Sequence, residues 1–422
     1  MQSDLLERIR KSFELEYKDI KRCAIAYSGG IDSTAMALIL QDLGIEIVTV
    51  SLDLGQNLKK ARQTAPLVCE KNLFFDAKED LLANIKKGVW ANTLHEGFIN
   101  SEGLSRPIIA KYLVKAAEME GCDAVVHGSS GSGNDQFRME NSIRVLAPHL
   151  RIIAPVRDWN LSREDSVEYV KKKNVGIKLG KQPPFSIDEN LWCRTIRYGL
   201  LSSPSFRVPE QAYNWTKSPQ ECPSSSTRLI IDFKHGFPDR LRILPDKKYY
   251  KNSDVFLALN KVGGKNGIGR YNSVQDNLIG LKSHKVFECP AATIITMAHK
   301  ELERLTLTSK ELELKNYLDH VWSRLVYDGG WYTRLRHALE GFISYTQNAV
   351  TGTVELSICR GTIELVEMSS SYALYDPRLS SRAKNALFDQ RDSRGFAKLW
   401  GLQDIIAYRM DASKLFEKEK LF

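Results

Sequence analysis

The chain has 422 residues, which is long enough for two domains, each with its own core. Its hydrophobic content of 43% and charged content of 26% are those of a globular protein, and no apolar run reaches membrane-spanning length. The net charge is +9, but the basic residues are interleaved with acidic ones. This favours a solvated surface with anion-binding sites over a nucleic-acid interface. Seven scattered cysteines without a CxxC pair, and the lack of a secretory signal, lead us to expect a cytoplasmic protein. The eight histidines show no HxxxH or HxH spacing, which argues against a transition-metal site. We expect no membrane or nucleic-acid partner and no metal site built by protein side chains.

Residues 1–21 are predicted to form an amphipathic helix, either packed on the fold or presented to a partner. From 22 to 175, short apolar runs alternate with segments of helical spacing. Strands are predicted at 23–27, 45–52, 73–75, 123–128 and 150–155, and helices at 33–40, 57–71, 79–92 and 105–120. Pro107 falls in the first turn of the last helix, and a capping-box-like start at Ser162 opens another. This alternation predicts an α/β, Rossmann-like domain with a doubly wound parallel sheet, which binds ligands at the carboxyl ends of its strands.

The pattern changes in residues 176–378, which we predict to be a second, α+β domain. The Pro-, Ser- and Asn-rich stretch 181–226 indicates a long irregular connection, and 228–295 offers short β-like runs between Gly-rich turns. Residues 296–350 are mostly helical in pattern, and 353–359 with 362–368 predict a hairpin that turns at Arg360-Gly361. The charged, helix-prone tail 379–422 fits an oligomerisation arm and a packed terminal helix equally well.

The first motif is Ala26-Tyr27-Ser28-Gly29-Gly30-Ile31-Asp32-Ser33-Thr34, between a predicted strand and a predicted helix. Adjacent glycines let backbone N–H groups approach an anion, and the helix N-terminus and nearby hydroxyl groups add further attraction. The motif therefore predicts a phosphate cradle. It has no Walker lysine, and it resembles the SGGxDS loop of N-type ATP pyrophosphatases, which cleave ATP between its α and β phosphates.

The second motif is Gly128-Ser129-Ser130-Gly131-Ser132-Gly133-Asn134-Asp135-Gln136-Phe137-Arg138, which also follows a predicted strand. Its three glycines suit an anion nest. Asn134 and Arg138 lie one helical turn apart on the same face. Asp135 offers a fixed negative charge for an ammonium group. Two such loops at one sheet edge indicate a shared ligand site.

Segments along nearly the whole chain resemble argininosuccinate synthase. They are AYSGGID, GNDQxR, LAP (Leu146 to Pro148), IAPVRDW (Ile153 to Trp159), SIDENLW (Ser186 to Trp192), GGKNGIGR (Gly263 to Arg270), the ECP at Glu288, LVYDGGW (Leu325 to Trp331) and VTGTV (Val350 to Val354). The resemblance implies a homotetrameric ligase that uses ATP and Mg²⁺. In that family the ureido oxygen of citrulline attacks the ATP α-phosphate, and the aspartate amine then displaces AMP from the adenylate.

Carried over to matching positions, the resemblance implies three catalytic residues, Asp32, Asn134 and Arg138. It implies an ATP site made of Ala26, Tyr27, Ser28, Gly29, Gly30, Ile31, Asp32, Ser33, Thr34, Leu52, Gly128, Gly131 and Gly133. Aspartate is expected at Ser130, Asn134 and Asp135. The acceptor is expected at Phe98, Gly103, Asn134, Arg138, Ser186, Thr195, Gln275 and Phe287.

Four acceptor positions depart from the family pattern together. Phe98 and Phe287 stand where the family has tyrosines, Gly103 where it has a serine and Gln275 where it has a glutamate. Glu102 also replaces a threonine. Losing two or more hydrogen bonds to a charged ligand, at about 1.5–3 kcal/mol each, weakens binding at least about a hundredfold. We therefore expect a ureido or amide acceptor other than citrulline.

Other readings stay open. The chain fits an authentic argininosuccinate synthase if local groups replace the lost contacts, for example if Glu102 meets the α-ammonium. An inactive regulatory paralogue is disfavoured by the intact loops. A tRNA-modifying pyrophosphatase is disfavoured because CxxC is absent and GNDQxR is present, and the lack of a glutaminase domain disfavours chemistry like that of GMP or asparagine synthetase.

Overall fold

The computed structural model describes residues 2–177, 185–246, 248–380 and 387–419. Contacts divide the chain into two compact units, Met1–Tyr372 and Ala373–Phe422. Parts of the predicted connection (181–184) and of the predicted tail (381–386 and 420–422) lie outside the described residues. Within this description, no helix is both long enough and apolar enough to cross a bilayer.

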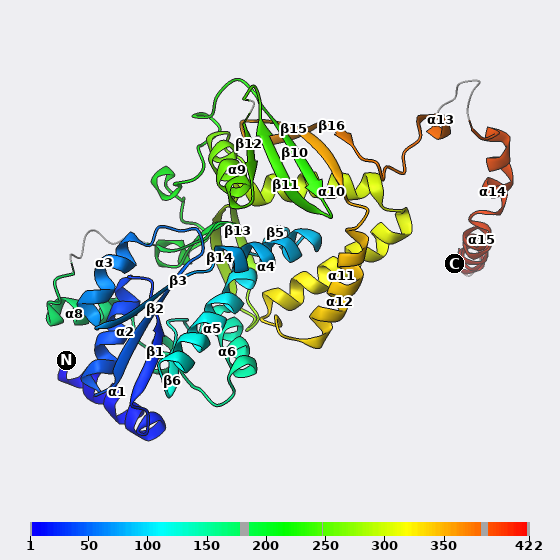
Figure 1. Cartoon of the computed structure of the whole chain (residues 1–422). Helices are drawn as coiled ribbons and strands as arrows, with labels where there is room; N and C mark the ends of the chain where they lie inside the picture. The colour runs from blue at the N-terminus through cyan, green and yellow to red at the C-terminus, as the bar shows by residue number, and fades with distance from the viewer. Residues whose placement is uncertain (1, 178–184, 247, 381–386, 420–422) are drawn as a thin grey trace. The chain divides into compact units, whose positions relative to one another are not determined.

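The N-terminal half of the larger unit is built on a five-stranded parallel sheet in the order β3-β2-β1-β6-β7 (Figure 1). Its strands are β1 (Arg22–Ala26), β2 (Glu46–Asp53), β3 (Lys71–Asp76), β6 (Ala124–Val126) and β7 (Arg151–Ile153). The helices are α1 (Gln2–Tyr17), α2 (Ile31–Asp42), α3 (Lys59–Val68), α4 (Lys78–Trp90), α5 (Glu102–Met119), α6 (Asp135–Leu146), α7 (Pro155–Asp158) and α8 (Arg163–Lys173). A small hairpin, β4 (Leu94–His95) and β5 (Phe98–Ile99), precedes α5.

Helices cover both faces of this sheet. Successive side chains of a strand point to opposite faces, so neighbouring residues of β1 enter different cores. Cys23 and Ile25 of β1 pack into one core with α1, α2, α3 and α8. Ala24 packs into the other core, with α4, α5 and α6. The predicted α/β class and doubly wound parallel sheet are confirmed.

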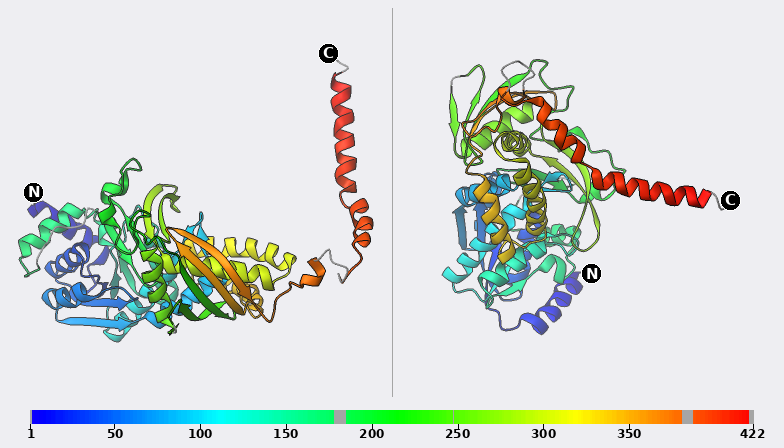
Figure 2. Two further views of the ribbon diagram at one scale, coloured as in Figure 1. Left: turned by 90° about the horizontal axis from the view of Figure 1, so that it is seen from above. Right: turned by 90° about the vertical axis from the view of Figure 1, so that its right-hand side faces the viewer.

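The rest of the larger unit holds two antiparallel sheets. One, in the order β12-β11-β10-β15-β16, appears in Figure 2 with the orange strands beside the green ones. Its strands are β10 (Thr227–Lys234), β11 (Phe237–Ile243), β12 (Tyr249–Lys251), β15 (Gly352–Cys359) and β16 (Thr362–Ser369). The other, β13-β14-β9-β8, consists of β8 (Ser186–Glu189), β9 (Arg194–Arg197), β13 (Arg270–Asp276) and β14 (Lys282–Glu288). Helices α9 (Ser253–Lys265), α10 (Pro290–Thr306), α11 (Ser309–Tyr327) and α12 (Arg334–Thr346) complete it.

Two local predictions are confirmed. The hairpin β15–β16 turns at Arg360 and Gly361, which both have positive φ (45° and 85°), as a tight hairpin turn requires. Helix α8 begins with a full capping box, in which the Ser162 side chain accepts from the Asp165 N–H and the Asp165 carboxylate accepts from the Ser162 N–H.

Three local predictions are wrong. Helix α5 begins at Glu102, so Pro107 lies inside the helix and not in its first turn. The earlier start is held by Asn100, whose side-chain oxygen accepts from the Gly103 N–H. The connection 181–226 contains the strands β8 and β9, and the segment 228–295 contains helix α9 besides its strands.

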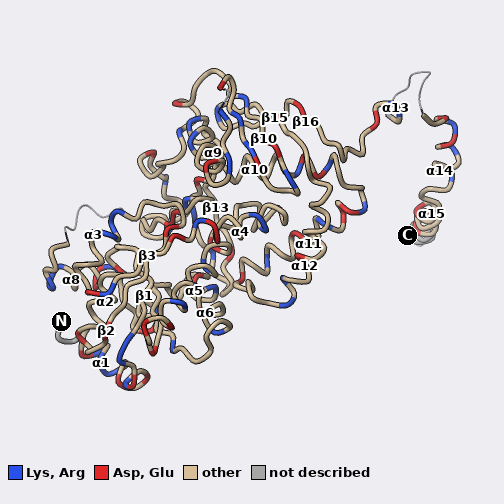
Figure 3. The backbone as a smooth tube through the Cα atoms, in the orientation of Figure 1, with Lys and Arg blue, Asp and Glu red and all other residues tan. Residues whose placement is uncertain are grey.

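The tail unit contains α13 (Pro377–Ser380), a 3-10 helix at Gln390–Asp392, α14 (Ser393–Leu399) and α15 (Leu402–Glu419). A ring contact joins Phe396 and Trp400. Its helical character is as predicted, and its role stays a prediction. Lys and Arg residues are interspersed with Asp and Glu over the described chain (Figure 3).

Glu288, at the end of β14, connects the loop at Trp215 and Thr216 to the sheet β13-β14-β9-β8. Its fully buried carboxylate pairs with Arg194 of β9 and accepts from the backbone N–H groups of Trp215 and Thr216, both at 2.8 Å. Removing one partner of a buried ion pair strands the other charge, at a cost of about 3–5 kcal/mol. We expect Glu288→Ala to lower the free energy of unfolding by about that amount in urea titrations. The control Glu313→Ala, on the exposed side of α11, is expected to change it by less than about 0.5 kcal/mol; equal effects would contradict this.

Candidate functional site

The first Gly-rich loop joins β1 to α2, and much of its chemistry serves to hold its own shape. The hydroxyl groups of Ser33 and Thr34 donate to the Gly30 carbonyl at 3.0 and 2.9 Å. The Tyr27 hydroxyl bonds Thr34 (3.0 Å) and also Thr64 of α3 (2.8 Å). Gly29 has φ +73° and lies against the backbone of α3. The loop is therefore fixed before any ligand arrives.

The second loop joins β6 to α6 and is held from behind by Gln136. The Gln136 side-chain amide donates to the carbonyls of Gly131 (2.7 Å) and Gly133 (3.0 Å). The Ser130 hydroxyl lies 3.4 Å from the Tyr198 hydroxyl. The strands before the two loops, β1 and β6, are paired neighbours in the parallel sheet, so both loops lie at the same edge.

A cavity of about 800 Å³ lies between the two loops. From the first loop it is lined by Ala26, Ser28, Asp32 and Ser33, and from the second by Gly128, Ser129, Ser130, Ser132, Gly133 and Asp135. Arg106, Arg163, Ser186, Asp188, Arg197 and Tyr198 line other walls. The N-termini of α2 and α6 begin at these loops, and helix N-termini favour anions. A nucleotide-sized anion fits this cavity.

The structure separates the predicted ATP residues into two groups. Ala26, Ser28, Asp32, Ser33, Gly128 and Gly133 line the cavity, whereas Tyr27, Gly29, Gly30, Ile31, Thr34, Leu52 and Gly131 do not. Tyr27, Ile31 and Thr34 are buried, and they support the loop from below. Asp32 forms a direct ion pair with Arg163 of α8, and both residues line the cavity. Among the described residues, no three His, Cys, Asp or Glu side chains gather as a metal site.

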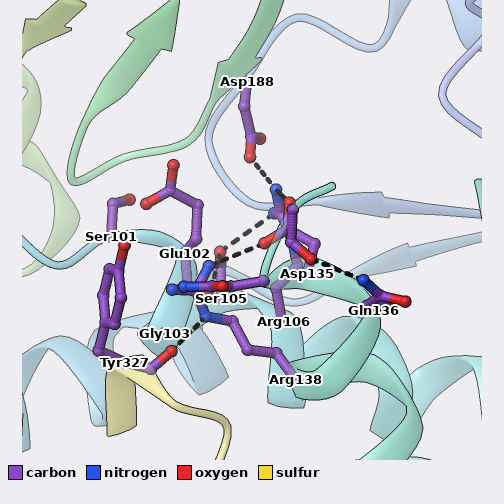
Figure 4. A network of polar contacts seen from close by, with 12 residues as sticks. Ser101, Glu102, Gly103, Ser105, Arg106, Asp135, Gln136, Arg138, Asp188 and Tyr327 are labelled. Carbon is purple, nitrogen blue, oxygen red and sulfur yellow. Dashed lines mark hydrogen bonds and ion pairs between the residues drawn. The ribbon is translucent and has the colours of Figure 1, made fainter. Parts of the chain in front are cut away.

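Asp135 lies at the centre of a buried ionic cluster (Figure 4). Its carboxylate accepts hydrogen bonds from Arg106 (3.0 Å), Arg138 (2.9 Å) and Arg197 (2.7 Å). Burial opposes its ionisation, but the three guanidinium groups outweigh burial and hold the pKa of the carboxyl well below its ordinary value. Asp188 is paired with Arg106 in the same cluster. Asp135 is thus already neutralised, and an ammonium group would have to displace an arginine to reach it.

The predicted acceptor residues converge through the register of the sheet β13-β14-β9-β8. Residues paired across antiparallel strands share a face. Thr195 pairs with both Phe287 and Asp188, and Ser186 pairs with Arg197. These side chains belong to one face of the sheet. Gln275 of β13 belongs to the same face, because it lies four residues after Tyr271, which pairs with Phe287. Arg197 of this face contacts Asp135 of α6, so the face meets the ionic cluster.

The replaced positions are filled by protein. Phe98 and Phe287 stack with ring centroids 5.9 Å apart, and the Gln275 amide donates to the His95 carbonyl at 3.1 Å. A Cβ at Gly103 would lie 2.6 Å from the Asn100 side-chain oxygen and 2.9 Å from Val326. A serine therefore has no room at 103 without a shift of its neighbours. Of the predicted acceptor residues, Ser186 is the one that lines the cavity.

Sequence reasoning missed Arg106, Arg197 and Lys285, which gather at this site. Arg106 follows the departing segment at 98–103, so its neighbourhood was a usable signal. Arg197 and Lys285 are distant in sequence but directly opposite one another in the β9–β14 register.

The comparisons with known proteins identify the family of this chain. The family model described as "Arginosuccinate synthase N-terminal HUP domain" matches residues 22–176, and the "Arginosuccinate synthase C-terminal domain" matches 185–407. The argininosuccinate synthase of Pyrococcus furiosus is 38% identical over 92% of this chain and 95% of its own length. That of Methanocaldococcus jannaschii is 40% identical (90% and 96%), and that of Archaeoglobus fulgidus 38% (92% and 99%). The chain belongs to the argininosuccinate synthase family of AMP-forming C–N ligases.

Proposed function

We propose that this enzyme is an argininosuccinate synthase that joins citrulline to aspartate with ATP. The observation that carries the proposal is the cavity of about 800 Å³ between the two Gly-rich loops. Arg106 and Arg197 also line it, as do Ser186 and Asp188 from the sheet β13-β14-β9-β8. The relatives of similar length named argininosuccinate synthase support it.

The proposed reaction has two steps. The ureido oxygen of citrulline attacks the α-phosphorus of ATP, the bond to the β-phosphate oxygen breaks, and pyrophosphate leaves. The neutral aspartate amine then attacks the ureido carbon, the bond from that carbon to the AMP oxygen breaks, and a proton is released. Proximity and fixed positive charge supply most of the catalysis in such transfers.

This chain's residues suit those steps. The Ser28 hydroxyl and the N-termini of α2 and α6 face the cavity where phosphates would lie. Asn134 and Arg138 each keep a buried side-chain nitrogen without a hydrogen-bond partner among the described residues, Nδ2 and Nη2. Both nitrogens can donate to the ureido oxygen and, in the second step, to the developing charge. Ser130 lines the cavity, and its hydroxyl group is available to bind aspartate.

Mg²⁺ is part of the proposal as the partner of ATP. Asp32 is the carboxylate of the first loop that lines the cavity, and oxygen ligands of this kind suit Mg²⁺ shared with phosphates. When bound, Mg²⁺ would offset charge on the phosphates. A homotetramer, a cytoplasmic location and the lack of nucleic-acid and membrane partners remain predictions.

The sequence led us to expect an acceptor other than citrulline, and the comparisons lend that expectation no support. Citrulline is the better-supported acceptor, because the relatives that match almost end to end carry the name of the citrulline enzyme. A less polar ureido or amide compound is the second candidate, favoured by the stacked Phe98 and Phe287 rings.

The test is pyrophosphate release by the full chain from ATP and aspartate, with citrulline and a panel of ureido and amide compounds. We expect release to require both citrulline and aspartate, and the gene to restore growth of an arginine auxotroph. A panel compound used at least 100-fold better than citrulline would overturn the acceptor. No release with any compound would favour an inactive paralogue.

A further inference from the structure

Several buried polar atoms at the acceptor face have no hydrogen-bond partner. They include Glu102 Oε1, Asn134 Nδ2 and Arg138 Nη2, on residues that are 3%, 5% and 1% exposed. Unpaired buried polar atoms are costly, and those that gather at a ligand site are available to hydrogen-bond the ligand. Two are donors and one is an acceptor, so the expected ligand carries both kinds of group.

Glu102 occupies the first turn of α5, beside the acceptor position Gly103. Its nearest cation is Arg197, with Nη1 3.7 Å from Oε1, which is too long for a hydrogen bond. Arg197 also bonds Asp135 at 2.7 Å and lines the cavity. Figure 4 shows the Glu102 carboxylate pointing away from the contacts of Arg106 and Asp135. The carboxylate is buried, and the one cation within 4.0 Å of it, among the described residues, is the Arg197 that it shares with Asp135.

Lys285 is the complementary case. It lies two residues before Phe287 on β14, on the same sheet face, and is 4% exposed. Its register partner is Arg197, another cation. Over the part of the chain that the structure describes, no carboxylate lies within 4.0 Å of Lys285 Nζ. The ammonium group lies 5.6 Å from the centre of the Tyr327 ring.

The charges of the cluster do not balance. Arg106, Arg138, Arg197 and Lys285 face Glu102, Asp135 and Asp188. Asp135 and Asp188 are engaged by arginines, which leaves Glu102 and Lys285 as the under-paired acid and base. They influence each other electrostatically, but no ion pair joins them within 4.0 Å among the described residues.

Resting on the proposed function, we infer that Glu102 and Lys285 bind the amino-acid end of the acceptor, Glu102 its α-ammonium and Lys285 its α-carboxylate. The class of ligand is a zwitterionic α-amino acid with a ureido group on its side chain. This pair replaces the contacts that positions 98, 103, 275 and 287 no longer make. The acceptor pocket is thereby rebuilt with charges from α5 and β14.

The ionisation states agree with this inference. Burial lowers the pKa of Lys285 to about 8; the carboxylate of Glu102 acts against that, whereas Arg138 and Arg197 add to it. Burial opposes ionisation of Glu102, but Lys285, Arg197 and Arg138 outweigh it and lower its pKa. Both groups are therefore charged at pH 7, and a bound carboxylate would raise the pKa of Lys285 again.

The test compares kcat/KM for citrulline with kcat/KM for its deamino and decarboxy analogues, which lack the α-ammonium and the α-carboxylate. In the native enzyme we expect each deletion to cost about 10- to 100-fold, the worth of a hydrogen bond between charged groups. Glu102→Gln should remove most of the preference over the deamino analogue and keep the preference over the decarboxy analogue. Lys285→Met should do the reverse, and Lys285→Arg should restore part of what Lys285→Met loses.

Two exposed residues give matched controls, Glu118→Gln on α5 and Lys282→Gln on β14. Neither should change any ratio. If Glu102→Gln and Lys285→Met lower kcat/KM equally for citrulline and both analogues, the two residues have a structural role. The inference is then wrong, although the proposed function stands. If the native enzyme ignores citrulline, the proposed acceptor and this inference fail together. Thermal unfolding of each variant shows whether it is folded.

Discussion

Replacing Gly29 by alanine is expected to lower ATP-dependent pyrophosphate release at least about 100-fold, because a displacement near 1 Å at a reacting group has that effect. A Cβ at this position would lie 2.7 Å from both Cα and N of Ala61 in α3. Backbone atoms of a helix cannot move aside as a flexible side chain can. The loop itself must shift, and the backbone N–H groups proposed to bind phosphate shift with it.

The same variant should be less stable. The positive φ of +73° costs an alanine about 1–2 kcal/mol, and the overlap adds about 1–3 kcal/mol. Gly44→Ala is the matched control, because Gly44 has φ +86° and nothing within 4 Å of the added Cβ. It should show the φ penalty and retain activity. Equal activity in the two variants would contradict the proposed fit of the loop against α3.

Replacing Asp135 by asparagine is expected to abolish aspartate-dependent turnover and to lower the free energy of unfolding by about 3–5 kcal/mol. The substitution keeps the shape of the side chain but leaves Arg106, Arg138 and Arg197 facing one another without their common anion. Urea unfolding and pyrophosphate release measure the two effects. Asp254→Asn, on an exposed residue of α9, should change neither.

The pH dependence of stability offers a sharper check on Asp135. Its pKa in the folded enzyme is well below the ordinary value of 3.8, so its stabilising effect is complete above that pH. The effect is lost as the pH falls below 3.8 toward the folded-state pKa. Asp135→Asn should therefore flatten the acid limb of the stability curve, and an unchanged limb would show that the carboxylate is not held by the arginines.

The parallel sheet could be predicted from sequence because its strands are continuous apolar runs buried on both faces. Strands β8 and β9 could not, since one of their faces carries the polar side chains of the site. Asp188, Thr195 and Arg197 interrupt any hydrophobic pattern there. Helix α9 was hidden by Gly263 and Gly264, which pack against Pro290 and the Trp215 carbonyl and do not form a turn.

The candidate site divides in the same way. Both anion loops could be recognised from local sequence, because glycine spacing between a strand and a helix has a local physical meaning. The state of Asp135 could not, because Arg106 and Arg197 reach it from other elements of the fold. Lys285 could not be recognised for the same reason, because only folding places it opposite another cation, Arg197.

Gln136 makes the second loop and helix α6 a single mechanical piece, since its side chain bonds the carbonyls of Gly131 and Gly133 while its backbone belongs to the helix. A ligand that orders this loop also orders the helix that carries Asp135 and Arg138. If ATP and aspartate bind as proposed, this coupling links them thermodynamically. Any factor by which nucleotide strengthens the binding of the amino acid is the factor by which the amino acid retains the nucleotide.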